Sequence, residues 1–146
     1  MSELLLVVEI CGRRVALLSS DVRSVIELER LTPVPRAPAH IAGMASLRSG
    51  LLTVIDCATA IRLDSSSQDR VGAHAAVVEV HGHPYALRVD RVVDVAQGTS
   101  PLMPPRTDLG AGWPEVTLGI VDTALGPLLV IDPAAVVAGR GFADAA

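Results

Sequence analysis

Two stretches of this chain repeat each other and decide its fold. Residues Gly12–Leu17 read GRRVAL and return 70 positions later as Gly82–Leu87, which read GHPYAL. A second set of repeated segments shares an offset of 76: Ile41–Gly43 with Thr117–Gly119, and Leu51–Asp56 (LLTVID) with Leu128–Asp132 (LLVID). An internal repeat of this length, holding several short strands, predicts two similar packing units. We expect function to lie where the two units meet.

The composition favours strands built from aliphatic side chains. Half of the 146 residues are hydrophobic, but only Tyr85, Trp113 and Phe142 are aromatic. Clusters of β-branched residues favour strands. The predicted strands are short apolar runs bounded by turn residues: Leu4–Ile10, Val15–Leu18, Ile41–Leu47, Leu51–Asp56, Ala75–Val80, Tyr85–Val89, Val116–Val121 and Leu128–Ile131. Their spacing predicts a mainly β protein of small barrels rather than a sheet of βαβ units.

Short helical turns are expected between these strands. Val22, Val25 and Ile26 follow Asp21 with helical i, i+3, i+4 spacing, and Val92 and Val95 follow Asp90 in the same way. A short acidic side chain can accept from the first backbone N–H groups of a helix. We therefore expect these aspartates to act as caps.

The domain organisation follows from the repeat. We expect a single domain over residues 1–140, with halves at roughly 12–63 and 75–137 and with shared terminal strands. The polar segment 64–70 is predicted to be a mobile linker, and residues 141–146 to be a frayed tail.

Charge and hydropathy exclude several classes of partner. The net charge is −4 and the chain has no lysine, so the clustered cations that bind phosphate backbones or anionic membranes are missing. The apolar run from Leu4 to Ile10 is far shorter than the roughly 20 residues needed to span a bilayer. We expect a cytoplasmic protein with no nucleic-acid partner and no direct membrane insertion.

Candidate chemistry is sparse. Asp56 and Asp132 could form an acid/base pair, but their equivalence under the repeat favours helix capping in each copy. His81 and His83 could share a metal, but Pro84 favours an exposed turn. The sequence has no glycine-rich phosphate loop and no nucleophile elbow. We therefore expect no enzymatic activity, no cofactor and no metal, although an enzyme or a ligand-binding barrel that uses these groups is an alternative.

The cysteines and one arginine complete the candidates. Cys11 and Cys57 adjoin apolar runs and are interpreted as small buried residues, with a disulfide or a reactive thiol as the alternative. Arg48 lies between two predicted strands, and Ala124 takes its place in the second copy. A residue present in one copy only suits a specific task, such as anchoring an interface. The alternative is a solvated surface arginine.

The order of three segments carries a family resemblance: Thr32–Pro38 (TPVPRAP), Ile41–Arg48 (IAGMASLR) and Val54–Asp56 (VID). With Ala16-Leu17 and Leu87–Asp90, they make the chain resemble the CheW-like family of bacterial chemotaxis coupling proteins, over about Leu4 to Val137. The resemblance implies two five-stranded SH3-like β-barrels packed about a shared core. It also implies a non-enzymatic scaffold that bridges a chemoreceptor's helical cytoplasmic tip and the regulatory domain of a CheA-type histidine kinase.

The resemblance also implies site residues. Those matching the family's receptor-binding groove between the barrels are Val22, Val25, Ile41, Gly43, Ser46, Leu47, Arg48, Val92 and Val95. Those matching the kinase-binding patch are Leu51, Leu52, Thr53 and Val54. The family usually has asparagine, glycine and proline where this chain has Ser46, Ser49 and Thr53. A divergent adaptor that binds a receptor or another partner without coupling to the kinase is therefore the alternative.

Overall fold

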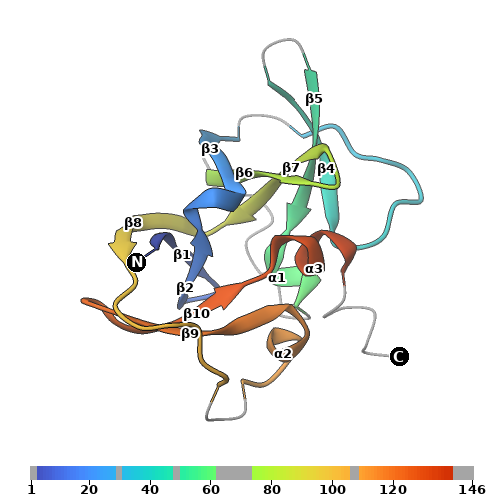
Figure 1. Cartoon of the computed structure of the whole chain (residues 1–146). Coiled ribbons are helices and arrows are strands. Elements are labelled where there is room, and N and C mark those ends of the chain that lie inside the picture. The colour runs from blue at the N-terminus through green and yellow to red at the C-terminus, as the bar shows by residue number, and fades with distance from the viewer. Residues whose placement is uncertain (1–2, 29–30, 48–49, 62–73, 106–108, 140–146) are drawn as a thin grey trace.

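The chain folds into two five-stranded sheets joined by short helices (Figure 1). A computed structural model describes residues 3–28, 31–47, 50–61, 74–105 and 109–139. The first sheet contains, in spatial order, β8 (Arg91–Gln97), β1 (Leu4–Ile10), β2 (Arg13–Leu18), β10 (Gly126–Ile131) and β9 (Thr117–Thr123). The second contains β3 (Val22–Glu27), β6 (His74–Val80), β7 (His83–Val89), β5 (Gly50–Asp56) and β4 (Ile41–Leu47). The predicted mainly β fold of two five-stranded units is confirmed.

Each sheet takes strands from both halves of the repeat. The β1–β2 hairpin of the first half lies between β8 and β10 of the second, and the β6–β7 hairpin lies between β3 and β5 of the first. The two parallel pairings, Val15 with Leu129 and Tyr85 with Thr53, occupy equivalent positions in the two copies. The sheets therefore do not follow the expected division at residues 12–63 and 75–137. Segments 64–70 and 141–146 lie outside the described residues.

Three apolar clusters form the core. One lies inside the first sheet and includes Val7 of β1 and Val121 of β9. Another lies inside the second sheet and includes Ala45 of β4 and Val77 of β6. The largest lies between the two sheets, because it draws on both of them and on the short helices. Burial of this shared cluster holds the two sheets together.

The expected helical turns after Asp21 and Asp90 are wrong, because both segments are strands. Val22 pairs with Val78 and Ser24 with Val77, so Arg23 is an extra residue in β3, and Val93 is its equivalent in β8. Such a bulge shifts the alternation of side chains by one position. Val22 and Val25 therefore face the same side although they are three residues apart. This spacing is the same as that of one helix face, so the sequence pattern predicts a helical turn where the structure has a bulged strand.

The cap prediction is confirmed for the two repeated aspartates. The Asp56 carboxylate accepts from the N–H groups of Ala58 and Thr59 at the start of α1 (Cys57–Ala60). The Asp132 carboxylate accepts from Ala134 N–H at the start of α3 (Pro133–Ala138). Both carboxylates stabilise helix starts that pack on the shared core. A third short helix, α2 (Trp113–Val116), buries the single tryptophan in the same cluster.

The hairpins β1–β2 and β6–β7 turn over two residues. Cys11 and His81 both have a φ of 51°, and the glycines that follow them have φ values of 81° and 82°. Positive φ at both positions gives the turn whose twist matches the flanking strands. Cys11 is exposed in this turn, so the expectation that it is buried is wrong. Cys57 is buried as expected, and neither cysteine is in a disulfide.

Glycines at repeated positions let a connector cross each outer strand. Thr32 pairs with Met44 of β4, and Met103 pairs with Ile120 of β9. A Cβ at Gly43 would lie 2.8 Å from the Thr32 carbonyl oxygen, and a Cβ at Gly119 would lie 2.5 Å from that of Met103. The repeated Ile-Ala-Gly and Thr-Leu-Gly segments therefore keep the space in which a second backbone covers β4 and β9.

Candidate functional site

The candidate site is an apolar strip on the edge strands β3 and β8. With β4 and β9 covered by connectors, β3 and β8 have a partner strand on one side only within the described part of the chain. Val25 pairs with Ala76 and Val95 with Leu6, so both valines face the same way as residues of the shared core. We call the accessible residues of this face the inter-sheet strip: Leu4, Val22, Val25, Val92 and Val95.

Exposure increases along the strip from its base to its rim. Val22 and Val92 are half-buried and pack against the shared core. Val25 and Val95, one bulge further along each strand, are 41% and 57% exposed. Strand β8 also lies against β6, which pairs with β3. Apolar side chains at equivalent positions of the two sheets thus form a continuous surface that runs from the shared core to the solvent.

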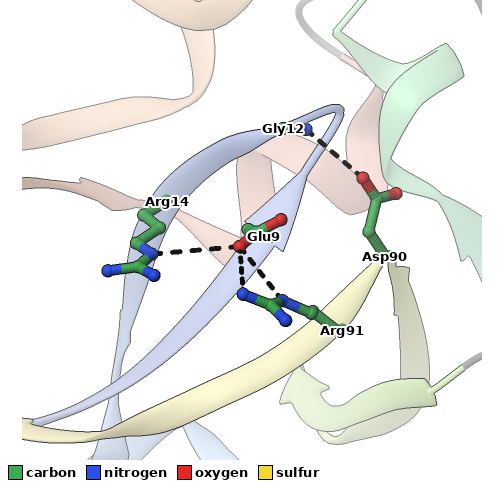
Figure 2. A network of polar contacts seen from close by, with 5 residues as sticks. All are labelled: Glu9, Gly12, Arg14, Asp90 and Arg91. Carbon is green, nitrogen blue, oxygen red and sulfur yellow. Dashed lines mark hydrogen bonds and ion pairs between the residues drawn. The ribbon is translucent and has the colours of Figure 1, made fainter.

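Ion pairs hold each edge strand beside its bulge. The Glu9 carboxylate of β1 accepts from Arg91 of β8, with N–O distances of 2.9 and 3.0 Å (Figure 2). Arg14 of β2 approaches the same oxygen at 3.8 Å. In the second sheet, Arg23 of β3 donates to Glu79 of β6 at 2.8 Å. These contacts link three strands around Glu9 and fix the edge that carries Val92 and Val95.

A second contact in Figure 2 fixes the turn before β8. The Asp90 carboxylate accepts from the backbone N–H of Gly12 at 3.3 Å. Asp90 was expected to cap a helix, but the segment that follows it is the strand β8. The expected cap is therefore wrong, and the carboxylate instead joins the two halves of the chain.

The edge of β8 is partly closed to strand addition. The Asp94 carboxylate accepts from the N–H of Val95 at 2.7 Å. That donor is one that an added strand would need, since strand addition proceeds through backbone hydrogen bonds. The side chains of the strip stay accessible. The geometry therefore favours a partner that packs on side chains, such as a helix, over one that extends the sheet.

The structure brings four of the predicted groove residues together and places four others on β4. Val22, Val25, Val92 and Val95 form the inter-sheet strip. Ile41 is half-buried against the shared core, Gly43 lies under the connector, and Ser46 is exposed. Leu47 pairs through its backbone with Gly50. Arg48 lies outside the described residues.

The four predicted kinase-contact residues alternate between the two faces of β5. Leu51 is 64% exposed, and Thr53 is half-buried and donates to the Met44 sulfur at 3.4 Å. Leu52 and Val54 point into the second sheet's interior cluster and are buried. Only the Leu51 and Thr53 side chains are therefore presented to a partner. Leu51 pairs across the hairpin with Ser46, which is also exposed.

The histidines and the buried cysteine considered as reactive or metal-binding groups do not form a site in the described residues. His81 and His83 are exposed in and beside the β6–β7 turn. Within the described residues, no group of three histidine, cysteine or acidic side chains is placed to hold a metal ion. Burial, with a smaller contribution from Asp56, raises the pKa of the Cys57 thiol. Because the thiolate is the nucleophilic form, this shift and the burial of Cys57 both disfavour its reaction in the folded protein.

Sequence reasoning missed three residues around the strip. Leu4 is an exposed member of the strip, Asp94 blocks the β8 edge, and Glu9 anchors β8. The signal for Glu9 was a single charge within an apolar strand, which usually marks a paired group. No pattern in the sequence identified Asp94, because its role depends on β8 being an edge strand.

Comparisons with known proteins agree with this geometry. The sequence model of the CheW-like domain matches residues 4–140, so the chain belongs to the CheW-like domain family. A protein of Rhizobium etli described as a probable chemotaxis protein CheW is 30% identical over 95 residues. That match covers 62% of this chain and 60% of the relative, so it spans less than two thirds of the relative's length.

A solved structure shares the fold. The crystal structure of the scaffolding protein TtCheW from Thermoanaerobacter tengcongensis aligns with a TM-score of 0.76 at 22% identity, over 93% of this chain and 92% of that one. The resemblance found in the sequence is thereby confirmed at the level of family and fold. In the described part of the chain, no helix is long and apolar enough to cross a membrane.

Proposed function

We propose that this protein is a non-enzymatic scaffold that couples chemoreceptors to a CheA-type histidine kinase in chemotaxis or motility signalling. The observation that carries the proposal is the inter-sheet strip. Its four valines stand at positions that match the receptor-binding groove of the family, and they meet at the surface on two edge strands held by ion pairs.

The strip suits a helical partner. Val25 and Val95 offer apolar area from two directions, which matches the helix-in-groove mode of recognition. The closed edge at Asp94 disfavours strand addition. A chemoreceptor's cytoplasmic tip is helical, so it is the partner we assign to the strip. The kinase contact is assigned to the exposed end of the β4–β5 hairpin at Leu51 and Thr53.

The test compares two valine substitutions of equal exposure. Val25 on the strip is 41% exposed, and Val34 on the proline-rich connector is 40% exposed. Each is replaced by aspartate, and each tagged variant is used to capture partners from the native cytoplasm. We expect Val25→Asp to lose the chemoreceptor, because a charge on the strip is desolvated on binding. Val34→Asp is expected to retain it.

Further outcomes separate the candidate functions. Arg48→Glu is expected to weaken receptor capture while the protein stays folded. Capture of a receptor without a kinase by the wild-type protein would favour the divergent adaptor over the coupling scaffold. Equal receptor capture by Val25→Asp and wild type would remove the strip from the proposed function.

A further inference from the structure

The charges around the inter-sheet strip are unevenly neutralised. The two arginines of the edge strands are paired, Arg23 with Glu79 at 2.8 Å and Arg91 with Glu9 at 2.9 Å. Glu27 and Asp94 are exposed, and neither has an ion-pair partner among the described residues. Among the described residues, the arginines of the two edge strands are therefore compensated and these carboxylates are not.

Acidic groups stand on both of the strands that carry the strip. Glu27 follows Val25 by two residues on β3, so its side chain leaves the same face of the strand. The Asp94 carboxylate lies at the free edge of β8, bonded to the N–H of Val95. Glu3 precedes Leu4 and accepts a hydrogen bond from the Ser20 hydroxyl at 3.4 Å. Carboxylates thus flank the apolar surface at three points.

The Asp21 carboxyl, close to one end of the strip, has acidic neighbours. Burial, followed by the charges of Asp132 and Glu3, raises the pKa of Asp21. Asp21 ends the short 3-10 helix Ser19–Asp21, which leads directly into β3. Acidic groups at this end of the strip therefore repel one another, and a cation arriving with a partner would relieve that repulsion.

We propose that the occupant of the inter-sheet strip is an amphipathic helix whose apolar stripe is flanked by lysine or arginine side chains. This rests on the proposed function, in which a helix binds the strip, and it adds the chemistry of that helix. The valines bury the apolar stripe, and the flanking cations meet Glu27 on β3 and Asp94 on β8. Exposed ion pairs are individually weak, so charge selects the partner and apolar burial holds it.

Two synthetic helices test the proposal. They share one apolar stripe at i, i+3, i+4 and i+7, and they carry lysine or glutamate at every flanking position. Binding to the whole protein is followed by fluorescence anisotropy at low and at high salt. Two or three rim contacts predict a preference of about tenfold for the lysine helix at low salt. The preference is expected to shrink at high salt, because exposed charges are screened.

Substitutions test which carboxylates cause the preference for the lysine helix. The double variant Glu27→Gln, Asp94→Asn is expected to lose most of the preference, while Asp122→Asn, an exposed aspartate on β9, is expected to keep it. The amide oxygen of asparagine can still accept from Val95 N–H, so the β8 edge is preserved. Val95→Asp adds a negative charge to the strip. A lysine helix held by charge alone would bind this variant at least as tightly as it binds the wild type. We expect the lysine helix to lose binding instead, because apolar burial holds it.

The possible results separate failure of the charge assignment from failure of the proposed function. Equal binding of the two helices, tighter binding of the glutamate helix, or a preference unchanged in the double variant would overturn the charge assignment and leave a helix-binding strip in place. If neither helix binds, the strip does not hold a helix, and the proposed function fails with the inference.

Discussion

Replacing Gly119 by alanine tests whether the repeated glycines exist to let the connectors cross the outer strands. The new Cβ would lie 2.5 Å from the Met103 carbonyl oxygen, whereas ordinary contacts begin at 3.4 Å. The connector would therefore have to move by about 0.9 Å (3.4 − 2.5). That movement strains the two backbone hydrogen bonds between Met103 and Ile120, which measure 2.6 and 2.8 Å.

The loss in free energy of unfolding is estimated from the steric overlap and from the strained hydrogen bonds. Overpacking against backbone costs about 1–3 kcal/mol, and each backbone hydrogen bond contributes about 1 kcal/mol net. We expect Gly119→Ala to lower the free energy of unfolding by roughly 2–4 kcal/mol. For a chain of this size that corresponds to a fall in Tm of about 4–16 °C.

The assay is thermal and urea unfolding followed by circular dichroism and by the fluorescence of Trp113. Gly126→Ala is the control, because Gly126 has a φ of +98° and a Cβ there would meet nothing within 4 Å. The control therefore measures backbone strain alone, which is about 1–2 kcal/mol. A Gly119→Ala protein no less stable than the control would refute the crossing as the reason for these glycines.

Three further predictions follow from the fold and from the pKa shifts. Fragments 1–66 and 67–146 are each expected to be unfolded alone and to regain the β circular dichroism signal when mixed, because every sheet takes strands from both; a folded isolated fragment would contradict the exchange. Asp21→Asn is expected to raise Tm at pH 7, because a carboxyl whose pKa is raised on folding destabilises the folded state while it is ionised. That gain should vanish as pH falls below about 3.8, where the carboxyl is protonated in both states; a gain independent of pH in a Tm series would exclude charge as its cause. A thiol reagent should react with one cysteine in the native protein, Cys11, and with both in urea, and two fast native thiols would show that Cys57 is accessible.

The sequence predicted the strands and the caps because their signals are local. Apolar runs bounded by turns marked nearly all of the strands, and the aspartates after each Leu-Leu run marked the starts of α1 and α3. The short polar side chain and the free N–H groups it satisfies are neighbours in the chain. No tertiary information was needed for either prediction.

The errors arose where strand pairing sets the outcome. A bulge at Arg23 places Val22 and Val25 on one face, and this cannot be distinguished from helical spacing without knowing that β6 lies alongside. The exchange of hairpins between halves was likewise hidden, because a repeat shows that two units are alike and not which strands pair. For the site, the resemblance supplied the four valines, but burial of Leu52 and Val54 depends on which face of β5 turns inward.

The repeat gives the inter-sheet strip a direction. Residues related by the 70-residue offset are Val22 with Val92, Val25 with Val95, Glu27 with Gln97, and Ser24 with Asp94. If the two halves were separate copies of one repeat, β3 and β8 would carry identical residues. A helix could then lie between them in either orientation. In this chain the valines are the same at equivalent positions of β3 and β8, whereas the carboxylates, Glu27 and Asp94, are at positions that are not equivalent. A helix seated on this surface therefore meets a different pattern when it is reversed, and a symmetric apolar strip becomes able to distinguish one end of its partner from the other.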